Sequence, residues 1–278
     1  MISIIIPTFN NLEYLKLCIK SLKKNSKFNH EIILHINDGS DGTTDFIKSK
    51  GYKFSYSSSN IGLCSSINKA AKLASFDYLL YSHDDMYFCP EWDDVLIKEI
   101  KSISHENFYL SGTMIEANSG HIVCNFGDTV ENFREDELIS KYKYINFYDH
   151  QGTHFAPHLV SKKMWNKVGG FSEEFNPGIA SDPDFNMKLW NEGVRIFKGL
   201  NDFKVYHFAS LTTRKKKNFI LNRGDRTFLK KWGITTNFFK KYYLKSKTKY
   251  DGPLTKPKVT LGYVFGLIGC KVKSIFTI

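Results

Sequence analysis

The first hundred residues alternate between short apolar runs and amphipathic stretches, and this alternation limits the possible folds more than any other feature. Four segments are expected to form strands: 2–7, which has the apolar content of a fully buried strand, 31–36, 52–57 and 77–82. Four stretches between or after them have a helical pattern: 12–24, 43–49, 61–74 and 90–102. Pro90 is expected in the first turn of the helix at 90–102. The alternation predicts an α/β fold, a mostly parallel twisted sheet with helices on both faces.

Polar residues gather where these four strands end: Pro7, Thr8, Phe9 and Asn10, then Asp38, Gly39 and Ser40, then Asn60 and Gly62, and lastly His83, Asp84 and Asp85. Such residues also make turns, so one loop of this kind carries little information. Four in succession are expected to converge on one crevice at the carboxyl ends of the strands. The adjacent carboxylates there offer oxygen ligands for a divalent cation that holds a phosphate-bearing substrate.

Two common nucleotide-binding motifs are absent from the sequence. It has no G-x-G-x-x-G after the first strand and no G-x-x-x-x-G-K-[ST], which disfavours a dinucleotide fold and a P-loop. Five scattered cysteines without a Cys-x-x-Cys pair indicate reduced thiols in a cytosolic protein. The amino-terminal MISIIIPTFN has no basic region and is interpreted as a core strand, not a signal peptide. We therefore expect a cytoplasmic location.

The net charge of +11 is unevenly distributed. Residues 1–210 have a net charge of −4, whereas residues 211–278 hold 17 Lys and Arg against Asp225 and Asp251, a net charge of +15. This asymmetry indicates an anionic partner surface. No nucleic-acid-binding module is recognised, so nucleic acid is not expected as a partner.

The apolar run at 259–269 is too short and too rich in glycine to span a membrane. With the basic and aromatic residues around it, the run suits an anchor on anionic lipid, peripheral on the inner membrane face. The alternative is a solvated basic helix followed by a tail that packs on the core.

Six motifs in the order SIIIPTFN, NDGSDGT, NIGLCSSINKAA, HDD, VGGFSEEF and SDPDF resemble those of family-two inverting glycosyltransferases with the GT-A fold. The resemblance covers about residues 1–210, and KWG at 231–233 is similar to a recurrent end of such domains. It implies a metal-dependent enzyme that moves a sugar from a nucleotide-diphosphate sugar, UDP favoured, to a hydroxyl of a glycan or lipid-linked acceptor. Mn²⁺ or Mg²⁺ is the implied cofactor.

The resemblance also implies a division of the chain. Residues 1–210 would form the GT-A domain, with a donor-binding half over about 1–115 and an acceptor and catalytic half over about 116–210. The periodicity is poor between 117 and 150, where an irregular excursion is expected. Residues 211–278 would form a basic, aromatic, helical extension.

Roles follow from the resemblance position by position. Asp38 matches the acid that holds the nucleotide base or ribose, and the other strand-end residues named above would line the donor site with it. Asp85 matches the metal-binding acid of the D-x-D motif, and His207 resembles a late histidine that can complete the metal site. Asp182 matches the general base, which takes the proton from the acceptor hydroxyl.

Three positions depart from the family pattern. His83 replaces the first acid of the D-x-D motif, and it either ligates a transition metal such as Mn²⁺ or only hydrogen-bonds the donor. Ser181 replaces the Glu beside Asp182, and Ile67 stands where many relatives carry Arg. Two alternatives stay open: a catalytically inactive relative that binds nucleotide or glycan, and a basic membrane-surface or nucleic-acid adaptor.

Overall fold

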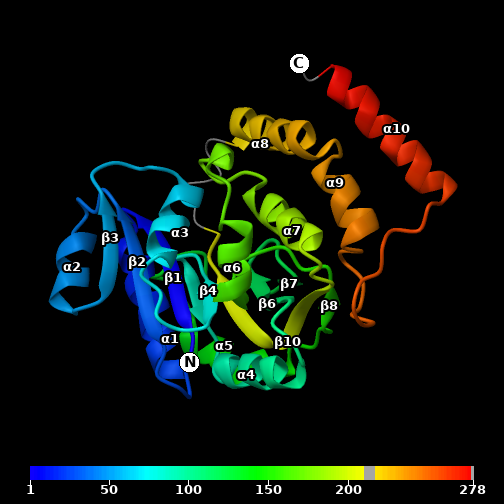
Figure 1. Cartoon of the computed structure of the whole chain (residues 1–278). Helices are drawn as coiled ribbons and strands as arrows, with labels where there is room; N and C mark the ends of the chain where they lie inside the picture. The colour runs from blue at the N-terminus through cyan, green and yellow to red at the C-terminus, as the bar shows by residue number, and fades with distance from the viewer. Residues whose placement is uncertain (210–216, 277–278) are drawn as a thin grey trace.

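The computed structural model describes residues 1–209 and 217–276, and Figure 1 shows a central sheet flanked by helices. In that view α3, α6 and α7 lie above the sheet and α4 lies below it. The expected boundary at 210/211 and the basic residues at 214–216 lie outside the described residues.

The amino-terminal half has the predicted alternation. Its parallel strands lie in the order β3 (Lys53–Ser57), β2 (Glu31–Asn37), β1 (Ser3–Phe9) and β4 (Tyr78–Tyr81). Its helices are α1 (Leu12–Asn25), α2 (Thr43–Ser49), α3 (Leu63–Ala71) and α4 (Trp92–Ser102). Pro90 lies before α4 and not in its first turn, because Glu91 takes a left-handed conformation with φ of 67° between them. The expected mostly parallel α/β sheet is confirmed.

The other half of the sheet mixes strand directions. β9 (His158–Ser161) runs antiparallel between β4 and β6 (Phe108–Glu116). β6 is parallel to β10 (Ile196–His207), and the short β5 (Met86–Phe88) pairs antiparallel with β10 at the sheet edge. The excursion expected at 117–150 contains only short elements: β7 (Ile122–Val123), α5 (Glu135–Lys141), η1 (Tyr142–Tyr144) and, at its end, β8 (His150–Gln151).

Helices α6 (Lys162–Val168), the 3-10 turn η2 (Glu173–Phe175) and α7 (Ser181–Asn191) follow β9. Ser161 caps α6 in the usual way, since its hydroxyl accepts a hydrogen bond from the backbone N–H of Met164. α7 begins after Ala180, whose φ of 63° turns the chain sharply into the helix.

The carboxyl-terminal segment packs on the body as four elements: α8 (Lys217–Trp232), α9 (Thr236–Phe238), η4 (Phe239–Tyr243) and α10 (Leu261–Ile275). One hydrophobic core extends from the buried isoleucines of β1 to Phe239 and Cys270. Full burial of an isoleucine side chain such as Ile5 contributes about 1.5–3 kcal/mol. Across residues 1–209 and 217–276, no helix has both the length and the apolar content needed to cross a membrane.

Candidate active site

Strand pairing at one edge of the sheet brings together three side chains that are far apart in sequence. β5 begins directly after Asp85 and runs antiparallel to β10, with His207 opposite Met86. On its other side β10 runs parallel to β6, which ends at Glu116. The register of two strand pairs therefore places Asp85, His207 and Glu116 at one corner of the sheet.

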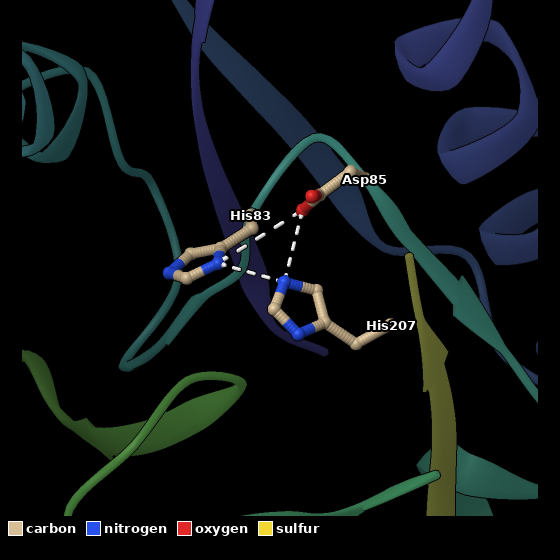
Figure 2. A group of neighbouring side chains, drawn as sticks. All are labelled: His83, Asp85 and His207. Carbon is tan, nitrogen blue, oxygen red and sulfur yellow. Dashed lines mark hydrogen bonds and ion pairs between the residues drawn. The ribbon is translucent and has the colours of Figure 1, made fainter. Parts of the chain in front are cut away.

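Figure 2 shows His83, Asp85 and His207 pointing toward one another, the first two from the loop between β4 and β5 and the third from the end of β10. His207 Nε2 lies 3.3 Å from Asp85 Oδ1 and 3.4 Å from His83 Nδ1, and that His83 atom lies 3.9 Å from the same Asp85 oxygen. The other nitrogen of His207, Nδ1, lies 2.6 Å from Oε1 of Glu116. The structure thus brings the two residues predicted as metal ligands into contact.

The surroundings give the two histidines different protonation states. Burial would lower the pKa of His207, but Asp85 and Glu116 outweigh this effect and raise the pKa to about 10. Burial and the neighbouring His207 lower the pKa of His83 to about 4. At neutral pH His83 is therefore uncharged and offers a nitrogen lone pair, whereas His207 carries a proton that a metal ion would have to displace.

The cluster fits a divalent cation. Among the described residues, one ligand atom from each of His83, Asp85 and His207 lies within 4.8 Å of the others. Glu116 can accept a hydrogen bond from His207 Nδ1, so once a cation displaces the Nε2 proton the remaining tautomer has its Nε2 lone pair directed at Asp85 and His83. Two imidazole nitrogens with one carboxylate suit Mn²⁺ better than Mg²⁺, which prefers oxygen ligands.

The loops after β1 and β2 meet, as the sequence predicts. Asn10 Nδ2 donates to Asp38 Oδ2 at 3.1 Å and to Ser40 Oγ at 3.2 Å, while its Oδ1 accepts from the backbone N–H of Gly39 at 2.9 Å. Asn10 and Asp38 have φ of 46° and 65°, a left-handed conformation that Asn and Asp adopt more readily than most residues. The Asn10 side chain therefore holds the loop that carries Asp38.

The loops after β3 and β4 join the same group. Asn37, at the end of β2, accepts a hydrogen bond from the backbone N–H of Ile61 at 3.0 Å, and Asn60 accepts one from that of Gly62 at 2.9 Å. Asn11 donates to Asp84 Oδ1 at 3.0 Å. These bonds confirm that the four strand-end loops converge.

The two adjacent acids after β4 face different partners. Asp84 is held by Asn11 from the loop after β1, whereas Asp85 faces the two histidines. Burial and the negative charge of Asp85 raise the pKa of Asp84. Of the remaining donor-site candidates, Pro7 and Thr8 are buried in β1, Phe9 is exposed, Gly39 is buried and Ser40 is exposed.

Asp182 lies in the first turn of α7, and the loop before α7 sets its position. Asn176 in that loop accepts from the backbone N–H of Cys64 at 3.0 Å and donates to Ser65 Oγ at 2.8 Å. A Cβ on Gly62 would collide with the Asn176 side chain, so only glycine fits at this contact. The start of α7 is thus fastened to the start of α3, directly after the third strand-end loop.

The environment of Asp182 suits a group that exchanges a proton near neutral pH. Burial raises the pKa of Asp182 to about 7, and its Oδ1 has no hydrogen-bond partner among the described residues. Tyr81, at the end of β4, is 1% exposed and its ring lies 5.5 Å from that of His83. Burial, Asp182 and then Asp84 raise the pKa of Tyr81, so Asp182 and the acidic loop share this buried neighbour.

The sequence interpretation missed Glu116 and Tyr81, although both carry the signal that identified Asp85. Each is the last residue of an apolar strand, Glu116 of β6 and Tyr81 of β4. Ser181, in contrast, gives no support to Asp182, because its hydroxyl donates to the backbone oxygen of Gly178 at 2.6 Å.

The chain is similar to known proteins over more than half of its length. Residues 3–159 match the family model described as Glycosyl transferase family 2, which covers more than half of the chain. An uncharacterized glycosyltransferase of Rickettsia prowazekii (strain Madrid E) is 27% identical over 229 residues, which cover 80% of this chain and 68% of that protein.

Solved structures show the same fold. The structure of Staphylococcus aureus TarS 1–349 in complex with UDP-GlcNAc superposes with a TM-score of 0.56 at 17% identity, covering 100% of this chain and 81% of the TarS 1–349 chain. The mannosyltransferase PcManGT of Pyrobaculum calidifontis, in complex with GDP-Man and Mn²⁺, gives a TM-score of 0.53 at 13% identity, with 76% of this chain and 57% of PcManGT covered. The fold is therefore that of the GT-A glycosyltransferases.

Proposed function

This chain belongs to glycosyl transferase family 2, a family of sugar-transferring enzymes, and on that premise we propose that it is a metal-dependent inverting transferase. Its donor would be a nucleotide-diphosphate sugar, UDP favoured, and its acceptor a hydroxyl of a glycan or lipid-linked saccharide. The observation that carries the proposal is that four strand-end loops meet beside the His83, Asp85 and His207 cluster. Asp182 and this cluster share the buried neighbour Tyr81.

The ligands of two structural neighbours support the donor class. TarS was solved with UDP-GlcNAc, and PcManGT with GDP-Man and Mn²⁺. Both ligands are nucleotide-diphosphate sugars, and the second structure includes the metal that the histidine-rich cluster of this chain favours.

The amino-terminal half, about residues 1–115, would bind the donor. Asp38 would accept hydrogen bonds from the base or ribose, with Asn10 holding it in place. Pro7, Thr8, Phe9, Gly39, Ser40, Asn60 and Gly62 would line the same site. Asp84, held by Asn11, would face the ribose side of the donor.

Asp85 and His207 would hold the cation, with His83 as a third ligand. A bound cation supplies Lewis-acid stabilisation of the negative charge that develops on the leaving diphosphate. Glu116 would orient His207 through Nδ1.

Asp182 would act as the general base. Its carboxylate takes the proton of the acceptor hydroxyl while that oxygen attacks the anomeric carbon on the face opposite the diphosphate. The new carbon–oxygen bond forms as the bond to the diphosphate oxygen breaks, and the nucleoside diphosphate leaves with that electron pair. A pKa of about 7 matches this role, because the base must be ionised before transfer yet able to hold a proton afterwards.

Donor hydrolysis by the purified full chain tests this proposal. A panel of UDP-, dTDP- and GDP-sugars with Mn²⁺ should yield free nucleotide for at least one donor, and proton NMR of the released sugar should show an inverted anomer. Asp182→Asn and Asp85→Ala should each lower the rate by about 10²-fold or more. Glu13→Gln removes an exposed carboxylate far from the cluster in sequence and should leave the rate unchanged.

Calorimetric titration with UDP and GDP distinguishes an active transferase from a catalytically inactive relative that only binds nucleotide. Nucleotide binding without hydrolysis or transfer of any donor would favour a catalytically inactive relative. Hydrolysis that survives Asp182→Asn would reject Asp182 as the base while leaving the transferase assignment in place.

A further inference from the structure

Helix α10 turns one continuous apolar face to solvent. Its members and their exposed fractions are Leu261 79%, Val264 40%, Phe265 70%, Ile268 50%, Val272 46%, Ile275 64% and Phe276 83%. At roughly 100° per residue these seven positions fall within about 120° of the helix circumference. Figure 1 places α10 at the periphery, beside α9.

The opposite face of α10 attaches the helix to the body, so the outward direction of the apolar face is fixed. The Tyr263 ring lies 5.0 Å from Phe238 and 5.3 Å from Tyr242. Cys270 is 3% exposed, and its Sγ accepts from the backbone N–H of Thr235 at 3.4 Å. The helix thus packs through Tyr263, Leu267 and Cys270 and leaves the seven apolar side chains of the other face outside.

Basic residues border this face. On the helical wheel Lys271 lies at one edge of the apolar sector and Lys273 beyond the other. Lys256 and Lys258 precede the helix, and residues 252–278 contain no Asp or Glu. This arrangement is typical of helices that lie in the membrane interface, where lysines reach the headgroups while apolar side chains enter the acyl boundary.

A crevice of about 400 Å³ opens beside the same face, between α8, α9 and α10. Its lining includes Val272 and Phe276 of the apolar face together with Arg226, Lys273 and one acid, Asp225, which accepts a hydrogen bond from Thr236. Apolar side chains and two cations therefore lie side by side at the edge of the apolar face.

We propose that the outer face of α10 docks the protein on an anionic lipid bilayer, with the helix parallel to the membrane plane. The helix is about 22 Å long, shorter than the roughly 30 Å hydrocarbon core, so it lies on the bilayer without spanning it. A second copy of the chain is a poorer occupant, because residues 211–278 carry a net charge of +15 and two such segments would repel each other. The docking surface is independent of the proposed sugar transfer.

Vesicle flotation of the full chain tests the proposal. We expect binding to phosphatidylcholine vesicles that contain phosphatidylglycerol, and much weaker binding to phosphatidylcholine alone or at high salt. The double variants Phe265→Ser/Ile268→Ser and Lys271→Gln/Lys273→Gln should each lower the partition coefficient by about tenfold or more. Tyr144→Ser removes an 82% exposed aromatic side chain from η1 and should bind like the unaltered chain.

The same variants must keep their circular dichroism spectra and donor hydrolysis rates, because α10 takes no part in the proposed chemistry. Absence of binding to the anionic vesicles would overturn the proposal, as would unchanged binding by Phe265→Ser/Ile268→Ser. Light scattering tests whether a second copy of the chain covers the face instead. If the unaltered chain is an oligomer, Phe265→Ser/Ile268→Ser is a monomer and neither protein binds vesicles, the face is assigned to a second copy.

Discussion

His207 Nδ1 lies 2.6 Å from Glu116 Oε1, while His207 Nε2 lies 3.3 Å from Asp85 Oδ1. One imidazole ring therefore connects a carboxylate at the end of β6 to the loop after β4. In metal sites this arrangement orients the histidine and raises its basicity as a ligand.

Glu116→Gln should consequently weaken Mn²⁺ binding by about 10–100-fold without unfolding the protein. The amide keeps the shape of the side chain but loses the charge that supports His207. Calorimetric titration of Mn²⁺ measures the affinity, and thermal melting checks the fold. Glu99→Gln, which removes the carboxylate paired with Lys198, is the matched control. Equal affinities in Glu116→Gln and the control would show that Glu116 does not act through the metal ligand.

His83 determines a second prediction, on metal preference. A neutral imidazole favours Mn²⁺ over Mg²⁺, so His83→Asp should raise the ratio of Mg²⁺- to Mn²⁺-supported donor hydrolysis several-fold. His83→Ala, which supplies no ligand, should lower the rates with both ions without restoring Mg²⁺ use. If His83→Asp leaves the ratio unchanged, His83 contacts the donor and not the metal.

The sequence predicted the half of the fold that depends on local periodicity. The strands and helices from Ser3 to Ser102 follow from the spacing of apolar residues. The loops after neighbouring parallel strands lie at the same edge of the sheet, so their polar side chains can form hydrogen bonds, as Asn10 and Asp38 do. Local patterns carry no information on which distant strands pair. The insertion of β9 between β4 and β6, and the pairing of β5 with β10, were therefore not predictable.

The same limit applies to the site. His207 is 122 positions after Asp85, and only the resemblance to a family connected them before the strand register was known. The outer face of α10 is another such case. The sequence of an apolar run that includes three glycines does not show which side of a helix is exposed. The contacts of Tyr263 with Phe238 of α9 and of Cys270 with Thr235 show which face of α10 remains outside.

Asp182 gives a prediction about pH. Burial raises its pKa from an ordinary value near 3.8 to about 7, so the protonated form is favoured in the folded state. Its contribution to stability is complete below about pH 4 and is lost as the pH rises through 7. Asp182→Asn should therefore raise the free energy of unfolding by about 1–3 kcal/mol at pH 8 and leave it unchanged near pH 4. Urea unfolding at both pH values measures the difference.

Catalysis should show the opposite pH trend. The base must be ionised, so kcat/KM should fall about tenfold per pH unit below pH 7. A rate that stays flat down to pH 5 would contradict the assignment of Asp182 as the base.

Asp184, two residues further along α7, should respond to substitution in the other direction. It is fully buried, and its Oδ1 accepts from Trp232 Nε1 at 2.8 Å and faces Lys231 Nζ at 3.0 Å. These contacts fasten α8 to α7, which gives the KWG segment a structural role. Asp184→Ala leaves the half-buried Trp232 indole N–H without its acceptor and Lys231 with fewer anionic partners, so it should lower the free energy of unfolding by about 1–3 kcal/mol at pH 8.

Trp232→Phe should reproduce part of that loss, because it removes the donor of the same hydrogen bond, and the double variant should lose less than the sum of the two. Fully additive losses would mean that the two side chains stabilise the fold separately. If Asp182→Asn and Asp184→Ala shifted stability in the same direction at pH 8, the assignment of Asp182 as a buried base and Asp184 as a structural acid would be wrong.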